Sequence, residues 1–290
     1  MLPATGAGLR DAVDWRFLTR LKPRYPRLIG VLAVVLLLTG WWGLRLWHLR
    51  GEVAGYRSYW SQVTMPIAPP GALRYVALGD SAAQGVGASD PQHGYVSLIA
   101  DHLRASSGRP VVVINISKSG ARIDDVLRDQ VPQLGGLDPD FVTVDVGGND
   151  VRRYQTSVWS TGAASLCAQL PAGRSVVADV PWFMHAYWEH DARQARDALT
   201  QACGKDGVAV APLAATFESH GWIGMFTLYA ADWFHPNDHG HRLWADAIWN
   251  TATSTPGLLR QVDLSGPTAR TDHQRASASA EPRRGVPVAR

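Results

Sequence analysis

Ser81 is the first residue in the central part of the chain whose type and setting suit covalent chemistry. It follows the apolar run Tyr75–Leu78 in the sequence Gly79-Asp80-Ser81, and a glycine-rich stretch comes after it. A serine at the end of a strand and near a helix N-terminus presents its backbone N–H to an anion and its hydroxyl to an electrophile. The same residues also fit a serine that caps a helix, whereas the phosphate-binding pattern G-x-x-x-x-G-K-[ST] is absent.

A histidine late in the chain has the partner that a general base needs. Asp232 lies three residues before His235, close enough to bind one ring N–H and leave the other ring nitrogen as a base. The alternatives are a structural histidine and a metal site built from the cluster His235, Asp238, His239 and His241. Pro236 and Gly240 disfavour a regular i, i+4 pair of helical ligands, and the metal-binding pattern HExxH is absent, so we predict no metal.

Two further loops carry groups that can stabilise a negative charge. Gly120 ends the sequence Asn115-Ile116-Ser117-Lys118-Ser119-Gly120, and a glycine there lets the backbone approach a ligand closely. Asn149 follows two glycines in Gly147-Gly148-Asn149-Asp150, and its amide can donate to an oxyanion. Each motif alone also fits an ordinary turn.

The elements that must position these residues are alternating strands and helices. Apolar runs predict strands at Tyr75–Leu78, Val111–Ile116, Phe141–Val146, Val176–Val180 and Val208–Ala211. Helical patterns lie between them, near 95–103, 121–131, 157–170 and 190–203, with a last helix from about Asp238 to Thr251. This alternation predicts an α/β domain with a five-stranded parallel sheet covered by helices on both faces. In such sheets ligands bind beyond the carboxyl ends of the strands, which is where the polar motifs fall.

An apolar segment near the N-terminus predicts a membrane span. Leu28–Leu44 has no charged residue, and Leu46 and Trp47 extend it, so we assign a single transmembrane helix to 28–47. Six basic residues precede this segment, namely Arg10, Arg16, Arg20, Lys22, Arg24 and Arg27. The positive-inside rule then places the N-terminus in the cytoplasm and the rest outside the cell membrane. The rival is a cleaved signal peptide, which the bulky, basic residues after the apolar run disfavour.

The remaining sequence sets the domain boundaries. We predict a basic cytoplasmic tail at 1–27, a linker at 48–72, a folded domain at 73–252 and a disordered tail at 253–290. The net charge is only +3, with no basic stripe, so nucleic acid is not a predicted partner. The two cysteines, Cys167 and Cys203, are either buried thiols or a disulfide, which an extracytoplasmic location favours.

Taken together, the four motifs resemble those of the SGNH hydrolase superfamily, also called GDSL esterases and lipases. The matching residues are Gly79-Asp80-Ser81, Gly120, Asn149 in Gly-x-Asn-Asp, and Asp232 with His235 in Asp-x-x-His-Pro. The resemblance covers about 73–252, although Ala82 stands where the name motif has Leu. It implies a three-layer α/β/α fold with a flavodoxin-like sheet. It also implies a Ser81–His235–Asp232 triad and an oxyanion hole made of the Ser81 and Gly120 N–H groups and the Asn149 amide.

The function that this resemblance implies is hydrolysis of acyl esters through an acyl-serine intermediate, with no cofactor. Envelope lipids and acylated glycans are the substrates that an outward-facing domain would meet. Aromatic residues in 181–188 and 222–234 are candidates for an acyl pocket, with core packing as their alternative role. Hydrolysis and acyl transfer to another alcohol both fit these residues. A catalytically silent envelope-binding domain and a metal-dependent hydrolase remain as alternative functions.

Overall fold

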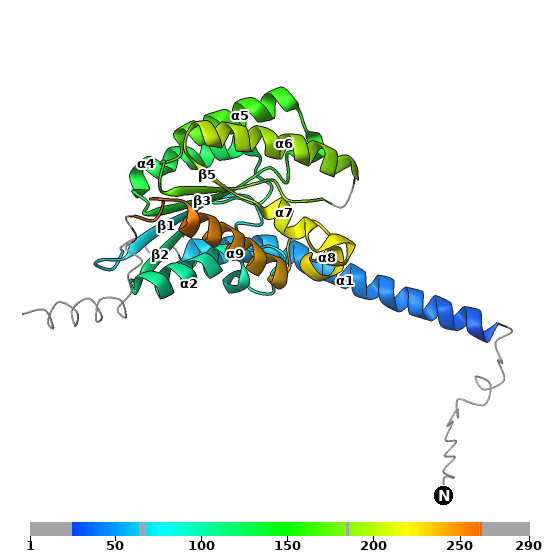
Figure 1. Ribbon diagram of the computed structural model, residues 1–290. Coiled ribbons are helices and arrows are strands. Elements are labelled where there is room, and N and C mark those ends of the chain that lie inside the picture. Colours follow the sequence, from blue (N-terminus) through cyan, green and yellow to red (C-terminus); the bar gives the residue numbers. More distant parts are fainter. Residues whose placement is uncertain (1–24, 64–67, 184–185, 261, 263–290) are drawn as a thin grey trace, which may run out of the picture. The chain divides into compact units, whose positions relative to one another are not determined.

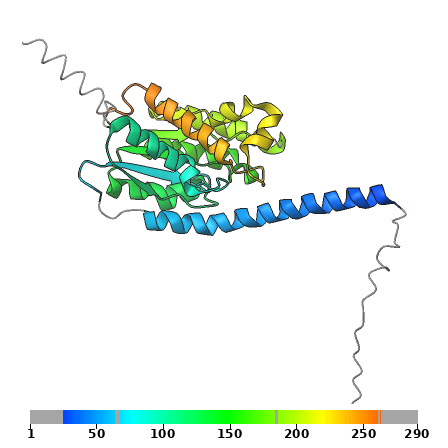
Figure 2. The same ribbon diagram turned by 90° about the horizontal axis from the view of Figure 1, so that it is seen from below.

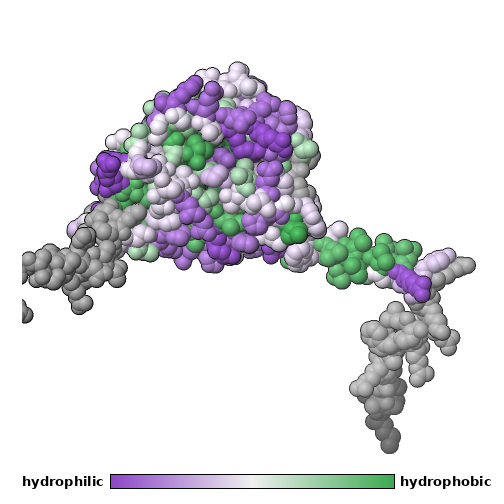
Figure 3. Space-filling model, viewed as in Figure 1, coloured by the Kyte–Doolittle hydropathy of each residue, from purple (hydrophilic) through white to green (hydrophobic). Residues whose placement is uncertain are grey.

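The computed structural model describes residues 25–63, 68–183, 186–260 and 262, which belong to two compact units. The first unit is Met1–Arg45, and its described part is Tyr25 and the beginning of helix α1 (Pro26–Val63). By its length and composition, α1 could cross a membrane, and Figure 3 shows hydrophobic residues along the part of it that extends from the domain. The hydroxyl of Thr39 donates to the carbonyls of Val35 and Leu36, so this polar group is satisfied inside the helix.

The second unit, Leu46–Arg290, begins inside the same helix, and here the structure differs from the sequence prediction. Residues 48–63, predicted as a linker, continue α1. Tyr56 and Trp60 are buried against the domain. The two side chains are four residues apart and therefore share one helix face. The short apolar stripe that they form is diluted by polar neighbours, which is why the sequence pattern did not reveal a docked helix.

A single five-stranded sheet organises the second unit. Its strands are β1 (Leu73–Gly79), β2 (Val111–Asn115), β3 (Phe141–Asp145), β4 (Ser175–Ala178) and β5 (Ala209–Ala211). The order is β2-β1-β3-β4-β5, and every pairing is parallel. This is the flavodoxin-like order, with its switch point beside β1. The predicted fold class is confirmed, including the position of each of the five strands to within a few residues.

Helices cover both faces of the sheet (Figures 1 and 2). Helices α2 (Tyr95–Ser107) and α9 (Asp238–Ser254) pack on one face, and α5 (Thr156–Gln169) and α6 (Ala186–Lys205) on the other. Alternation along β1 separates the two cores, because Tyr75 and Ala77 enter the first and Val76 and Leu78 the second. Strands with apolar side chains on both faces are the expected consequence of this layering.

Shorter elements complete the unit. They are η2 (Pro91–His93), α3 (Ile123–Asp125), η3 (Val126–Gln130), η4 (Val131–Gln133), α4 (Leu134–Leu137), η5 (Val151–Arg153), α7 (Leu213–Glu218) and α8 (Gly221–Leu228). The predicted helix near 121–131 is thus a series of short turns. Pro132 lacks the N–H that a regular helix needs there, which explains the break. The sequence pattern did not predict α7 and α8.

The two cysteines connect the helices on one face of the sheet. Cys167 on α5 and Cys203 on α6 form a disulfide. The folded domain extends beyond its predicted C-terminal boundary. The disordered tail was predicted to begin at 253, but the side chains of Leu258, Leu259 and Val262 are buried in the core. These three apolar side chains extend the packed part of the domain to Val262, and the rest of the predicted tail lies outside the described residues.

Candidate active site

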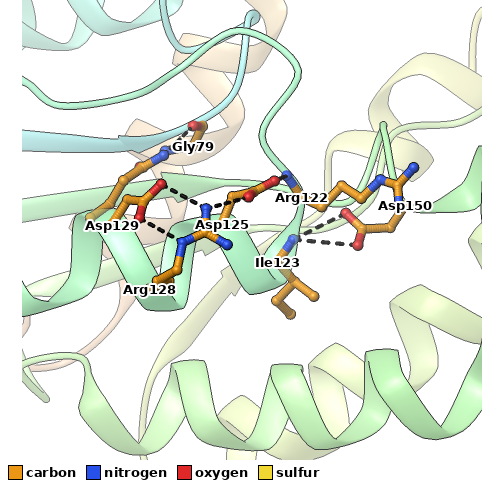
Figure 4. Close-up of polar contacts among 8 residues, drawn as sticks. Gly79, Arg122, Ile123, Asp125, Arg128, Asp129 and Asp150 are labelled. Carbon is orange, nitrogen blue, oxygen red and sulfur yellow. Dashed lines mark hydrogen bonds and ion pairs between the residues drawn. The ribbon is translucent and has the colours of Figure 1, made fainter.

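Ser81 follows the last residue of β1 by two positions, and its approach is fixed by a backbone clamp. The side-chain amide of Gln130 accepts a hydrogen bond from the Gly79 N–H at 2.8 Å and donates to the Gly79 carbonyl at 2.9 Å. Figure 4 shows Gly79 beside the segment that precedes Gln130, in which Arg128 pairs with Asp125 and Asp129. Gln130 is buried, so we expect its two hydrogen bonds to hold Gly79 in place. The exposed ion pairs of Arg128 contribute little to the stability of the fold. Sequence reasoning missed Gln130 because no motif marks it.

Ser81, His235 and Asp232 form a continuous chain of hydrogen bonds. The Oγ of Ser81 lies 2.8 Å from Nε2 of His235, and Nδ1 of the same ring lies 2.6 Å from Oδ2 of Asp232. Ser81 is almost completely buried, and the side chains of His235 and Asp232 are partly exposed. The structure therefore brings together the three residues predicted as the triad, although the serine and the histidine are 154 positions apart in the chain. With Nδ1 donating to Asp232, Nε2 is free to accept the serine proton.

The loop that carries Asp232 and His235 is held by its own backbone. Oδ1 of Asp232 accepts from the N–H groups of Phe234 and His235, both at 3.1 Å. Trp233, which lies between Asp232 and Phe234 in the sequence, adopts a left-handed backbone with φ of +54°, which is uncommon for a bulky residue. Burial would raise the pKa of Asp232, but its hydrogen bonds to His235 and Phe234 lower it below its usual value. The group thus stays a carboxylate beside the ring.

The three candidate oxyanion donors lie on separate loops. Among the described residues, the backbone N–H groups of Ser81 and Gly120 have no hydrogen-bond partner. Gly120 has a φ of +81°, as a glycine at a close approach can have. Nδ2 of Asn149 donates to Oδ2 of Asp80 at 2.8 Å and to the carbonyl of Ala121 at 3.1 Å. Both of its hydrogens are therefore engaged in this structure.

Asp150 links the loop that carries Gly120 to the loop that carries Asn149. Its carboxylate accepts from the N–H of Ile123 at 3.3 Å, as Figure 4 shows, so the residue after Asn149 is tied to the start of the helix after Gly120. Burial raises the pKa of Asp150 to about 7. The consequence is a fixed spacing between the Gly120 and Asn149 loops.

Beneath the triad lies a set of buried carboxyl groups. Burial raises the pKa of Asp80 to about 6. Burial, together with the nearby charges of Asp80 and Asp179, raises the pKa of Asp145 well above its usual value. A cavity of about 20 Å³ borders Asp80, Asp145, His235 and Trp244. This volume suits about one water molecule and is too small for an acyl chain.

The other members of the histidine cluster have separate partners. His241 is fully buried, and its Nδ1 accepts from the Tyr95 N–H while Nε2 donates to the Val86 carbonyl. Burial lowers the pKa of His241 to about 4, which keeps the ring neutral in this arrangement. Asp238 accepts from the N–H and the hydroxyl of Ser89. Within the described part of the chain, no group of three or more His, Cys, Asp or Glu is arranged to hold a metal ion.

Five of the aromatic residues predicted near an acyl pocket form two distinct groups. Phe183 and Phe234 stack at 5.7 Å and border the small cavity, so they are packing residues. Trp222, Phe226 and Trp233 are 70%, 62% and 46% exposed and contact one another edge to face. The second group forms an exposed apolar surface that includes Trp233, two residues before His235.

Comparison with known families gives one match over most of the domain. The model of the GDSL-like lipase/acylhydrolase family matches residues 77–243, a span that includes every candidate catalytic residue. Among curated proteins, the uncharacterized protein YpmR of Bacillus subtilis strain 168 is 40% identical over 81 residues. That match covers 27% of this chain and only 31% of the length of YpmR.

Solved structures resemble the domain as a whole. LAE5, an α/β hydrolase from the metagenome of Lake Arreo in Spain, has a TM-score of 0.53 and 21% identity, covering 62% of this chain and 94% of its own. A variant of the acetyl-xylooligosaccharide esterase Axe2 of Geobacillus stearothermophilus has a TM-score of 0.53 and 20% identity, covering 64% and 96%. The lipase/acylhydrolase of Enterococcus faecalis has a TM-score of 0.51 and 17% identity, covering 61% and 94%. These similarities show a shared fold.

Proposed function

Because this chain belongs to the GDSL-like lipase/acylhydrolase family, whose members hydrolyse esters, we propose that it is a serine ester hydrolase with Ser81 as the nucleophile. The observation that carries the proposal is the unbroken hydrogen-bond chain from Ser81 through His235 to Asp232. Its two distances, 2.8 and 2.6 Å, lie within the range over which a base takes a proton from a nucleophile.

The reaction proceeds in two half-steps. Nε2 of His235 takes the hydroxyl proton as Oγ of Ser81 attacks the ester carbonyl carbon, and the carbonyl electron pair moves onto its oxygen. Collapse of this tetrahedral species breaks the bond to the alcohol oxygen, which receives the proton from His235. A water molecule then repeats the sequence on the acyl-serine and releases the carboxylic acid. Asp232 holds the ring and stabilises its charged form in both half-steps.

The developing oxyanion needs donors, and three groups are candidates. The N–H groups of Ser81 and Gly120 lack protein partners among the described residues, so they can donate to it without breaking a bond. We assign the third position to the Asn149 amide. Its longer bond, to the Ala121 carbonyl, is the one that an oxyanion would replace, while Asp80 keeps the amide oriented.

The proposed substrates are esters at the cell envelope, such as lipids or acylated glycans. Support comes from the apolar helix on the same chain and from the open aromatic surface of Trp222, Phe226 and Trp233 near His235. An open surface accommodates an acyl chain that remains partly in a lipid phase, whereas the cavity of about 20 Å³ cannot enclose one.

The proposed topology is a single span at 28–47 with the N-terminus in the cytoplasm and the domain outside. The asymmetry of basic residues around the apolar segment supports this orientation. Fusion of alkaline phosphatase to the C-terminus is expected to give activity, because that enzyme folds only where disulfides form. The same fusion to green fluorescent protein is the reciprocal reporter, expected to be dark in this orientation. Strong fluorescence with inactive phosphatase would reverse the orientation.

The serine mechanism is tested by Ser81→Ala in the full chain. Hydrolysis of p-nitrophenyl esters of short and long acyl chains is expected to fall at least about 1000-fold, because no other group can form the acyl intermediate. Ser89→Ala is the matched control, since Ser89 lies on the same loop but binds Asp238. A fluorophosphonate should label the wild type and not the Ser81 variant. A folded wild type that neither hydrolyses nor becomes labelled would instead support a catalytically silent binding domain.

A further inference from the structure

The C-terminal part of helix α1 lies outside the residues that match the family model, yet it contacts the loop that follows Ser81. The family match begins at residue 77, whereas this part of the helix, within Leu46–Val63, belongs to the same compact unit as the active site. Tyr56 and Trp60 on this helix are 9% and 4% exposed.

Three side chains of the helix bind three backbone groups of the loop. Oε2 of Glu52 accepts from the N–H of Gly87 at 3.0 Å. The hydroxyl of Tyr56 donates to the Ala88 carbonyl at 2.6 Å, and Nε1 of Trp60 donates to the Gln84 carbonyl at 2.9 Å. The spacing of four residues places all three on one face of α1. All three bonds are to backbone, so the helix holds the chain at Gln84, Gly87 and Ala88 whatever the side chains there.

The side of the 84–88 loop that faces away from α1 contacts the segment that carries His235. A Cβ on Gly87 would lie 2.3 Å from the Pro236 carbonyl oxygen and 2.9 Å from Cβ of His235, so the two backbones touch with no room for a side chain. Nε2 of His241 also donates to the Val86 carbonyl from that side. The loop is therefore clamped between α1 and the segment that carries His235. The loop is joined to the nucleophile as well, because the N–H groups of Gln84 and Val86 both donate to the Ser81 carbonyl at 3.1 Å.

We infer that Glu52, Tyr56 and Trp60 are positioning residues, and that the C-terminal part of α1 is a functional part of the active site. This inference rests on the proposed function. The brace formed by these three side chains holds the Ser81 Oγ at hydrogen-bond distance from Nε2 of His235. Displacing a nucleophile by about 1 Å lowers the reaction rate on the order of 100-fold. Loss of even one or two of these hydrogen bonds is therefore expected to lower kcat.

The test uses the full chain in detergent. Glu52→Ala combined with Tyr56→Phe removes two of the bonds, and kcat for a p-nitrophenyl ester is expected to fall about 10- to 100-fold with KM changed less than about threefold. The rate of labelling by a fluorophosphonate should fall by the same factor, because it reports the reactivity of Ser81 directly. Glu52→Gln keeps a carbonyl oxygen for the Gly87 N–H and should retain at least about a third of the wild-type kcat.

Controls separate positioning from simple stability. Arg57→Ala changes an exposed residue of the same helix and should match the wild type. Tyr56→Phe alone deletes one hydroxyl, and its kcat is expected to fall about fivefold. If the double variant fails to fold, this single variant tests the positioning role instead. An active wild type whose folded brace variants keep full kcat and labelling rate would overturn the brace alone. A wild type without hydrolysis or labelling would overturn the proposed function, and the brace with it.

Discussion

Replacing Asp232 by Asn is expected to lower kcat about 1000- to 10,000-fold while the domain stays folded. Asn keeps the oxygen that accepts from the Phe234 and His235 N–H groups, so the loop retains its shape. The atom facing Nδ1 of His235 then becomes the amide nitrogen, which donates a hydrogen bond where the carboxylate accepted one. The ring then favours the tautomer with hydrogen on Nε2, which cannot take the proton from Ser81. Steady-state kinetics on a p-nitrophenyl ester measures the loss, with KM expected to change little.

A second aspartate–histidine pair provides the control for this substitution. Asp246 lies 3.5 Å from His102 in an exposed pair between α9 and α2. Asp246→Asn makes the same chemical change without touching the triad and should leave kcat within about twofold. If Asp232→Asn were equally harmless, His235 would not need its carboxylate partner, and the proposed role of Asp232 would be abandoned.

The parts that sequence analysis predicted share a physical basis. Strands buried on both faces require continuous apolar runs, so β1 to β5 were visible in the sequence. In a parallel sheet the carboxyl ends lie at one edge, so residues far apart in sequence had to meet there. Ser81 and Asn149 both follow strands of this sheet, so the sequence predicts that they meet at one edge. The pairing of Asp232 with His235 is local, because their spacing fits a single turn.

The parts that it did not predict depend on contacts that leave no local pattern. Gln130 contributes one buried amide to Gly79 from a segment of irregular turns. The docked half of α1 shows only two buried aromatics among polar residues, which is the composition of a linker. Asn149 was predicted from its type, but its present bonds to Asp80 and Ala121 are tertiary. Such features follow from the whole fold, and the sequence pattern alone cannot supply them.

Gly79→Ala is expected to destabilise the domain severely, by at least about 4 kcal/mol. Gly79 has a φ of +137°, and a Cβ there would lie 2.1 Å from the Asp145 carbonyl oxygen. The obstacle is backbone of the paired strand β3, which cannot move aside as a flexible side chain would. Relief requires the end of β1 to separate from β3, and that also breaks the clamp from Gln130. Urea unfolding followed by tryptophan fluorescence measures the change in the free energy of unfolding.

Gly173→Ala separates the cost of the crowding from the cost of the backbone conformation. Gly173 also has a positive φ, +74°, but no heavy atom lies within 4 Å of a Cβ built there. The left-handed conformation alone costs about 1–2 kcal/mol, which is the loss expected for this control. A similar loss for both variants would mean that β1 and β3 can part at little cost. The close approach at Gly79 would then not be what fixes the strand end, and the rigid placement of Ser81 would have to come from the Gln130 clamp and the α1 brace.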